Sequence, residues 1–304
     1  MENPKLIVIL GPTASGKTEL AIRLAEKFSG EVVSADSRQV YKGMNIGTAK
    51  PGKKDMETIK HYLIDIKNPN QLYTAWQYKK DAIKAINKII QKGKVPFLVG
   101  GTGLYLKSVI DNLEIPQVKP DFKLRKKLEL KIKKQGLRSL YDELIEIDPE
   151  AAYIVDPQNP RRIIRALEVA IKTKKPFSQQ RKKGKPLFNP LIIGREPSKE
   201  KLIEKIEKRT DKMMEDGLMK EVKKLVRLYG KNLPAFDAIG YKEIIDYLTK
   251  KISLAEAVER IKKNTRHFAK RQMTWFKKDK RIKWIEDYRK AENLTEKFLQ
   301  NISD

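Results

Sequence analysis

Residues 11–18 read GPTASGKT and match the pattern G-x-x-x-x-G-K-[ST], which is a phosphate-binding loop. The flanking segments fit this loop. Residues 5–10 (KLIVIL) form an apolar run of strand length, and residues 19–28 place apolar side chains at i, i+4 and i+8 on one helical face. Strand, glycine loop and helix in this order direct unpaired backbone N–H groups at an anion. The motif therefore predicts an α/β fold with an anion bound at the end of its first strand.

The loop residues have separable tasks. Two glycines allow a sharp turn and a close approach of the backbone, the lysine adds a point charge, and the final threonine can offer its hydroxyl to Mg²⁺. We therefore predict Mg²⁺ as the cofactor and Thr18 as its ligand. The predicted phosphate-binding residues are Gly11, Pro12, Thr13, Ala14, Ser15, Gly16, Lys17 and Thr18. The motif identifies a ligand group and not a reaction, because kinases, ATPases, GTPases and enzymes that expel diphosphate all use such loops.

The composition indicates a polyanionic partner. The 304 residues include 66 Lys or Arg and 39 Asp or Glu, a net charge of +27, which predicts binding to nucleic acid or to an anionic membrane surface. No apolar run approaches about 20 residues, so we expect no membrane insertion. The absence of cysteine excludes disulfides and thiolate zinc sites and is compatible with the cytoplasm, the expected location. The two histidines, His61 and His267, are not in a metal-binding spacing.

The pattern of the chain changes twice. Residues 1–113 alternate strand-like runs with helical stretches, which predicts a parallel sheet core covered by helices on both faces. Residues 114–193 are expected to form an all-helical insertion domain, although an apolar run of strand type returns at 191–193. Residues 194–304 are expected to complete the core, mainly with helices. The strands predicted in the first part are residues 5–10, 31–35, 61–66 and 95–100.

Basic residues concentrate in the predicted insertion. Residues 115–190 contain 19 Lys or Arg and 9 Asp or Glu, with clusters at 123–134 and 181–185, which favours this region as a nucleic-acid grip. A solvated helix face is the alternative interpretation of the first cluster. A third basic stretch, residues 260–283, has aromatic residues among its cations that suit base stacking or, as the alternative, packing in a core. Those aromatic residues are Phe268, Trp275, Phe276 and the adjacent Trp284.

Two further segments end predicted strands near the phosphate loop. Asp36 directly follows the strand at 31–35, so its carboxylate is expected in the same crevice, where it could ligate Mg²⁺ or accept a proton. Residues 100–105 (GGTGLY) follow the strand at 95–100 and suggest another close approach to phosphate, with Thr102 as the hydroxyl. That strand ends in glycine where a typical NTPase carries an aspartate, which weakens a nucleotide-hydrolysis interpretation.

Several segments, in order along nearly the whole chain, resemble the tRNA dimethylallyltransferase family, also called tRNA isopentenyltransferases. They are residues 11–18, 35–51 (ADSRQVYKGMNIGTAKP), 99–107 (VGGTGLYLK), 156–169 (DPQNPRRIIRALEV) and 267–277 (HFAKRQMTWFK). The resemblance implies transfer of a dimethylallyl group from dimethylallyl diphosphate to N6 of the adenosine directly 3′ of the anticodon. It also implies that the helical insertion grips the anticodon stem-loop of tRNA. The lack of cysteine leads us to expect a bacterial-type short form without a C-terminal zinc finger, and a monomer is expected.

The resemblance also implies catalytic roles. The amides of residues 13–18 and Lys17 would hold the diphosphate of the donor, which is the leaving group and needs preorganised hydrogen-bond donors. Asp36 matches the family's general base, and Thr102 matches a threonine near the bridging oxygen of the diphosphate. Arg209, in the context R-x-x-x-M-x-x-x-G-L, matches an arginine that binds the diphosphate.

The target base must leave the anticodon-loop stack before it can react. The residues that the resemblance assigns to tRNA contact come from both predicted domains. They are Asp36, Ser37, Arg38, Gln39, Thr102, Arg125, Gln158, Asn159, Pro160, Arg161, Arg162, Ala238, Ile239, Gly240, Tyr241, Lys242 and Glu243.

Two other classes of function compete with this interpretation. A phosphate-loop kinase acting on a small molecule or nucleotide would bind ATP, transfer phosphate and show little salt dependence. A noncatalytic RNA-binding protein with a relic loop would bind tRNA without turnover. Plant relatives that modify free AMP or ADP share the loop, but the basic insertion argues against that substrate here.

We expect that replacing Arg181, Lys182 and Lys183 with alanine flattens the slope of log tRNA affinity against log salt concentration. The expected change is up to about one unit for each RNA phosphate that the variant no longer neutralises, because each neutralised phosphate releases a condensed counterion. Binding titrations over a range of salt concentrations measure the slope. An unchanged slope would exclude this cluster from the RNA interface.

Overall fold

The computed structural model describes residues 3–180 and 182–301, so Arg181 of the predicted basic cluster lies outside the described residues. The chain forms two compact units, one made of Met1–Ile110 and Pro186–Asp304 and the other of Asp111–Lys185. The predicted insertion boundary at residue 193 is wrong. The apolar run there belongs to the strand Asn189–Arg195, which pairs with the first strand of the sheet and is part of the larger unit.

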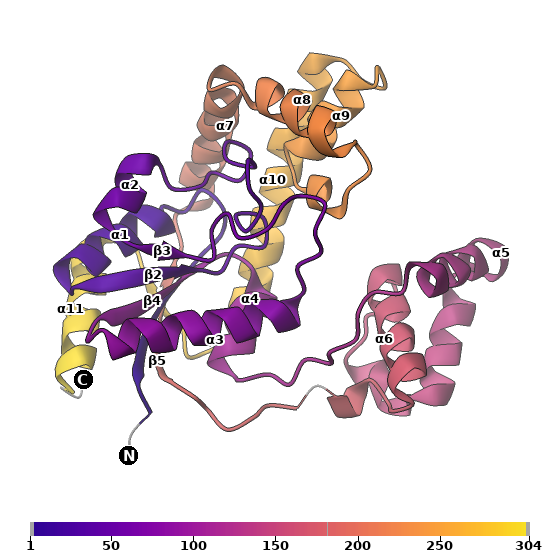
Figure 1. The fold of residues 1–304 in the computed structure, drawn as a ribbon, viewed down its shortest axis with the longest axis horizontal. Coiled ribbons are helices and arrows are strands. Elements are labelled where there is room, and N and C mark those ends of the chain that lie inside the picture. Colours follow the sequence, from indigo (N-terminus) through magenta and orange to yellow (C-terminus); the bar gives the residue numbers. More distant parts are fainter. Residues whose placement is uncertain (1–2, 181, 302–304) are drawn as a thin grey trace. The chain divides into compact units, whose positions relative to one another are not determined.

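The larger unit contains a six-stranded sheet in the order β3-β2-β4-β1-β5-β6, and all five pairings are parallel. The parallel sheet flanked by helices that the sequence predicts is therefore confirmed (Figure 1). The strands are β1 (Lys5–Leu10), β2 (Gly30–Ser34), β3 (His61–Tyr62), β4 (Val95–Gly100), β5 (Asn189–Arg195) and β6 (Lys283–Ile285). The strand predicted at 61–66 is only two residues long, because Leu63 and Asp65 have φ values of 65° and 55° that no strand allows.

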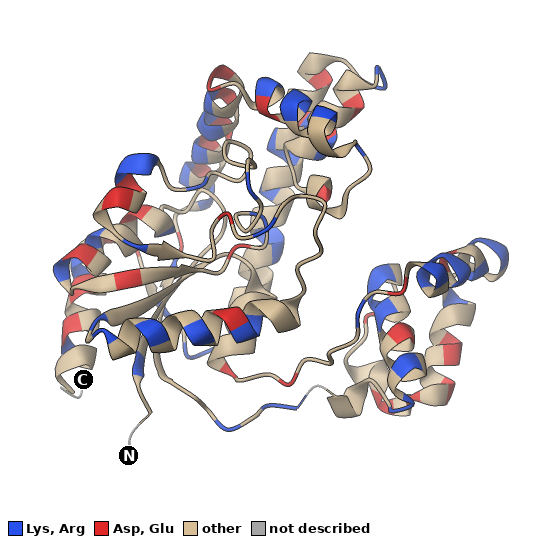
Figure 2. Ribbon diagram, in the orientation of Figure 1, with Lys and Arg blue, Asp and Glu red and all other residues tan. Residues whose placement is uncertain are grey.

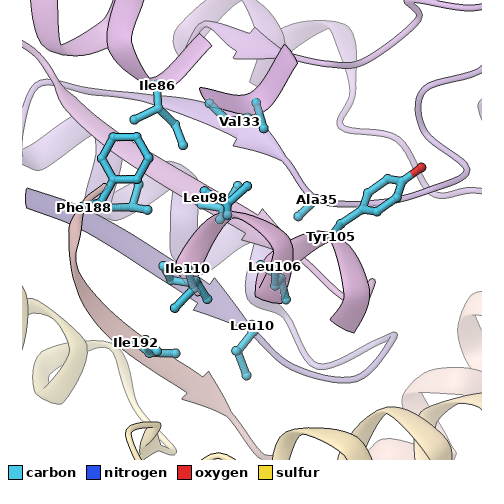
Figure 3. Packing of buried hydrophobic residues seen from close by; sticks show 14 of the residues in the cluster. Leu10, Val33, Ala35, Ile86, Leu98, Tyr105, Leu106, Ile110, Phe188 and Ile192 are labelled. Atoms are coloured by element: carbon cyan, nitrogen blue, oxygen red, sulfur yellow. The ribbon is translucent and has the colours of Figure 1, made fainter. Parts of the chain in front are cut away.

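Helices cover both faces of the sheet, as buried parallel strands require. Even-numbered residues of β1 face one apolar cluster with α3 (Ala75–Gln91) and α4 (Gly103–Ile110), and Figure 3 shows Ile86, Tyr105 and Leu106 of these helices around Leu10 and Leu98. Odd-numbered residues of β1 face a second cluster with α1 (Lys17–Lys27) and α11 (Tyr288–Gln300). The alternation fixes which face of the sheet each side chain of β1 covers, and the parallel pairing with β4 and β5 fixes the edge at which the following loop emerges.

A third apolar cluster anchors the chain that follows β2. Val40, Tyr41 and Met44 are buried against helices from the C-terminal part of the chain, so residues far apart in sequence form one wall beside the sheet. The helices of this part are α7 (Lys199–Glu215), α8 (Leu218–Tyr229), α9 (Tyr241–Leu248) and α10 (Leu254–Phe276), with a short 3₁₀ turn, η3 (Pro234–Asp237). The short helix α2 (Lys53–Thr58) follows the anchored segment.

The smaller unit is built from α5 (Phe122–Ile147), η1 (Pro149–Tyr153), α6 (Pro160–Thr173) and η2 (Ser178–Gln180). Gly136 interrupts α5 with φ 83° and ψ 162°, a backbone conformation that favours glycine. The Nζ atom of Lys131 lies 2.8 Å from Oε2 of Glu143, whereas 12 residues of straight helix would span about 18 Å. α5 is therefore two helices folded back on each other. Figure 2 shows lysine and arginine dense along the first of them.

No helix within residues 3–180 and 182–301 is both long and apolar enough to cross a membrane.

Candidate active site

The predicted site lies where the chain leaves the sheet at the carboxyl ends of β1, β2 and β4. In the strand order, the chain leaves β1 toward β2 on one side of β1, whereas it leaves β4 toward β5 on the other side of β1. A crevice opens where these two connections diverge, at the carboxyl end of β1. A pocket of about 490 Å³ occupies this position. The residues predicted for catalysis or phosphate binding that line it are Thr13, Ala14, Gly16, Lys17, Thr18, Asp36 and Arg209.

The phosphate loop forms an anion cradle of four open amides. Ala14 and Gly16 have φ values of 62° and 82°, which turn successive N–H groups toward one side of the loop. Within the described chain, the amides of Ala14, Gly16, Lys17 and Thr18 donate no hydrogen bond. The expectation that every amide from 13 to 18 is open is wrong, because the Ser15 amide bonds Pro12 O at 3.3 Å and the Thr13 amide is held by a side chain.

That side chain is Gln272 of α10, a residue to which the sequence reasoning gave no role. Its Oε1 accepts from the Thr13 amide at 2.9 Å, and its Nε2 donates to the carbonyl oxygen of Gly101 at 2.8 Å. One buried amide group therefore ties the phosphate loop to the turn after β4. The position lies within the segment 267–277, but its spacing gives no indication that one helix spans both turns.

Two cations from different elements converge on the cradle. Burial lowers the pKa of Lys17 to about 8, against the opposing effect of the Asp36 charge, and the nearby Arg209 charge lowers it further. Lys17 Nζ donates to Pro12 O at 3.2 Å. Arg209 of α7 donates from NH1 to the hydroxyl of Thr13 at 3.1 Å, and burial lowers its pKa too. An anion in this pocket would find positive charge already desolvated.

Asp36 and Thr102 are brought together by the adjacent ends of β2 and β4. The Thr102 hydroxyl accepts from the Ser37 amide at 3.0 Å, and the Thr102 amide donates to Ala35 O at 3.1 Å. The hydroxyl proton of Thr102 is then free to be donated elsewhere. Asp36 Oδ1 accepts from the amides of Arg38 and Gln39 at 2.8 and 3.3 Å. Its Oδ2 atom makes no hydrogen bond to the described residues, so this oxygen can meet a substrate.

Arg38 and Gln39, two of the residues predicted to contact tRNA, also make hydrogen bonds within the protein. Gln39 lines the pocket and accepts from the Ser34 hydroxyl at 3.0 Å. The guanidinium of Arg38 donates to the carbonyl oxygens of Pro234 and Ala235 at 2.9 and 3.2 Å. The two Arg38 bonds fasten the Asp36 turn to η3.

The predicted segment 238–243 is mostly internal. Ala238, Tyr241 and Glu243 are buried, and Glu243 Oε2 accepts from the Gly240 amide at 2.8 Å. Ile239 is half-buried and Lys242 is exposed. Any contact of this segment with RNA would therefore use mainly its exposed lysine and its backbone.

The predicted contacts in the smaller unit divide in the same way. Arg125 forms a two-pronged ion pair with the buried Glu168, at 2.8 Å to Oε1 and 2.7 Å to Oε2, which the sequence pattern did not indicate. Asn159 caps α6 by accepting from the Arg162 amide at 3.2 Å, and Pro160 occupies the first helical position. Gln158, Arg161 and Arg162 are exposed at this helix start.

The aromatic residues of the third basic stretch are mainly structural. Phe276 is fully buried in the core, and Trp275 and Trp284 are partly buried against it, so the stacking hypothesis is wrong for Phe276. Phe268 is 38% exposed and lines the pocket.

The pocket offers few ligands for a metal. Within residues 3–180 and 182–301, no group of three or more His, Cys, Asp or Glu side chains could hold a metal ion. Mg²⁺ does not require such a group, because it keeps several waters and takes one or two protein ligands together with substrate phosphates. Thr18 and Asp36 line the same pocket, so the oxygen donors present fit this mode of binding.

Comparison with known proteins identifies relatives along nearly the full chain. The family model described as IPP transferase matches residues 39–279. The tRNA dimethylallyltransferase of Acetivibrio thermocellus is 48% identical over 98% of this chain and 96% of its own, and that of Carboxydothermus hydrogenoformans is 46% identical over 97% and 96%.

Solved structures agree with these relatives. The full-length tRNA isopentenylpyrophosphate transferase from Bacillus halodurans is 39% identical, with a TM-score of 0.72 over 98% of this chain and 96% of its own. A eukaryotic dimethylallyltransferase, solved in the course of acting on tRNA, is 30% identical, with a TM-score of 0.82 over 99% of this chain and 80% of its own. The cradle, the carboxylate and the threonine described above thus occur in a chain that belongs to the IPP transferase family.

Proposed function

We propose that this protein is a tRNA dimethylallyltransferase. It transfers the dimethylallyl group of dimethylallyl diphosphate to N6 of the adenosine 3′ of the anticodon, and it releases diphosphate. The observation that carries the proposal is the shared pocket, in which an anion cradle and a carboxylate with one open oxygen face the same space. The similarity to relatives named for this reaction supports the choice of substrates.

In the proposed reaction, the bond between C1 of the dimethylallyl group and the diphosphate oxygen breaks, and N6 forms a new bond to C1. The diphosphate keeps the electron pair and is stabilised by the four open amides, Lys17 and Arg209, which lie in place before the reaction. The Thr102 hydroxyl can donate to the departing oxygen. Mg²⁺ held by Thr18 would neutralise further charge on the diphosphate.

Asp36 is the proposed acceptor of the N6 proton. The exocyclic amine is a weak nucleophile because its lone pair is delocalised into the ring, so the proton becomes acidic only as the new bond forms. Two backbone amides bind Oδ1 and thereby fix the orientation of the carboxylate. Oδ2 is left available to accept the proton. The proposal places the enzyme in the cytoplasm, as a monomer that acts on the anticodon stem-loop of tRNA.

The direct test is transfer of label. With radiolabelled dimethylallyl diphosphate, tRNA and Mg²⁺, we expect label in the tRNA without added ATP. Enzymatic digestion of the tRNA should locate the label on the adenosine 3′ of the anticodon. Consumption of ATP with no labelled tRNA would support the kinase interpretation instead. Binding of tRNA with no transfer would leave only an RNA-binding function.

Replacing Asp36 with alanine or asparagine should lower single-turnover transfer by about 10²- to 10⁴-fold, the usual contribution of a general base. Asparagine can still accept the two backbone hydrogen bonds, but it cannot take the proton. Affinity for tRNA, measured by filter binding, should change only modestly. Wild-type rates in the asparagine variant would rule out Asp36 as the base.

The lowered pKa of Lys17 predicts a pH effect on anion binding. Above about pH 8 the free enzyme loses this charge, so affinity for inorganic diphosphate should fall as pH rises. Between pH 8 and pH 9 the protonated fraction falls about fivefold, and the affinity should follow. Calorimetric titrations with inorganic diphosphate should be compared for the wild type and Lys17→Arg. The arginine stays charged over this pH range, and the ionisation of diphosphate itself affects both proteins equally. Parallel pH profiles would contradict the prediction.

A further inference from the structure

The pocket has one wall that contains no helix or strand. The chain leaves the Asp36 turn, passes residues 43–47 without regular structure, and then presents Thr48, Ala49, Lys50 and Pro51 to the pocket. Loops of this kind are mobile unless their backbone groups are bound. The bonds that hold this loop therefore decide how well the wall is placed.

One carboxylate, Glu221 in the first turn of α8, binds the loop through three successive amides. Its Oε2 accepts from Asn45 at 3.0 Å and from Ile46 at 2.9 Å, and its Oε1 accepts from Gly47 at 3.3 Å. Hydrogen bonds to an ionised carboxylate are about twice as strong as neutral ones. The loop is thus fastened to a helix from a distant part of the sequence.

The hydrogen bonds continue from this loop to the catalytic carboxylate. The carbonyl oxygens of Thr48 and Ala49, directly after the clamped amides, both accept from Gln39 Nε2 at 3.3 Å. The backbone amide of Gln39 in turn donates to Asp36 Oδ1. Glu221 is therefore connected to Asp36 through one loop and one side chain.

The same carboxylate also holds a second predicted tRNA-contact segment. The hydroxyl of Tyr241, at the start of α9, donates to Glu221 Oε1. Its ring packs on Gly47 so closely that a Cβ there would lie 2.4 Å from the ring. The segments 36–39 and 238–243 are far apart in sequence. Glu221 is bonded to Tyr241 of the second segment and to residues 45–47, which directly precede the two residues that Gln39 of the first segment binds.

The far end of the loop has its own anchor. Lys50 Nζ, on a side chain only 3% exposed, donates to the carbonyl oxygen of Tyr41 and pairs with Asp65. The hydrogen bonds and the ion pair of Lys50 are made to residues outside α8, among them Asn45, whose Oδ1 accepts at 3.0 Å. Loss of the Glu221 bonds would therefore loosen residues 45–49 without releasing the whole segment.

We propose that Glu221 is a positioning residue for the acceptor side of the reaction. It holds the wall that carries Thr48 and Ala49, and through Gln39 the Asp36 turn, in the place where the extruded adenosine is received. The inference rests on the proposed function, since it assumes that tRNA is the acceptor. Glu221 is expected to affect the tRNA and not the allyl donor, because none of the Glu221 bonds reaches the phosphate loop.

The test is Glu221→Gln. Glutamine has one acceptor oxygen and an NH₂ group that would face N–H and O–H donors, so it cannot satisfy all four partners. We expect kcat/KM for tRNA to fall by about tenfold to a hundredfold, as small misplacements of reacting groups cause. The KM for dimethylallyl diphosphate and the Kd for inorganic diphosphate should stay within about twofold. Hydrogen exchange at the amides of 45–47 should speed up by about tenfold or more.

Glu200→Gln is the matched control. Glu200 is exposed in the first turn of α7 and makes no hydrogen bond or ion pair with the described residues, so the variant loses the same charge without changing the loop. It should keep wild-type constants for both substrates. Tyr241→Phe removes only one of the four bonds, and it should shift kcat/KM for tRNA in the same direction by a smaller factor. This second variant keeps the test decisive if Glu221→Gln does not fold.

The possible outcomes are distinct. Wild-type kcat/KM for tRNA in folded Glu221→Gln, or in Tyr241→Phe where Glu221→Gln does not fold, would overturn the inference. Equal reductions in kcat/KM for tRNA and in affinity for diphosphate would also overturn it, since they would indicate a general structural role. Absence of transfer by the wild-type enzyme would instead contradict the proposed function on which the inference rests.

Discussion

The close approach of β2 and β4 at their carboxyl ends is the constraint on which the site depends. Gly100 ends β4 directly against the chain that follows β2, where a Cβ would lie 2.3 Å from Ala35 O. Only at that separation can the Thr102 amide bond Ala35 and the Thr102 hydroxyl accept from Ser37. The glycine that replaces the usual acidic residue of a nucleotide hydrolase thus has a structural reason. It places a hydroxyl next to the turn that carries Asp36, the proposed catalytic carboxylate, and keeps a negative charge away from the phosphate loop at this position.

Helices from the C-terminal part of the chain complete what the sheet begins. The phosphate loop and Asp36 follow strands of the sheet, but α7 and α10 fix the conformation of the loop at Thr13. Arg209 of α7 donates to the Thr13 hydroxyl, and Gln272 of α10 accepts from the Thr13 amide. On the acceptor side, α8 and α9 hold the wall after Asp36. Under the proposed function, the two substrates would therefore be positioned by different helices on a common sheet, and substitutions in α8 are expected to affect the tRNA and not the allyl donor.

Much of this arrangement could be predicted from local sequence. The phosphate loop, the strands before it and after it, and the position of Asp36 follow from apolar periodicity and from the rule that parallel strands end at one edge. Gln272 and Glu221 could not be predicted in this way, because the backbone groups that each of them binds lie more than 170 residues away in the sequence. Arg125 lies in a basic cluster that the sequence predicts to bind RNA, but in the structure it is paired with the buried carboxylate of Glu168. Apolar periodicity does not identify Glu168 as its partner. The boundary predicted at residue 193 is wrong because the strand there, β5, pairs with β1 and belongs to the sheet, and this long-range pairing leaves no local sequence signal.

The pocket holds two buried cations, Lys17 and Arg209, with a single carboxylate, Asp36, as the opposing charge. Lys17 and Arg209 both have pKa values lowered by burial, and each is only partly offset by the charge of Asp36. Such an arrangement opposes folding, because desolvated like charges repel. A multiply charged anion reverses the balance, since it supplies the missing charge at the point where four amides are already open. In the proposed reaction, the same two cations and open amides would stabilise the diphosphate as it departs.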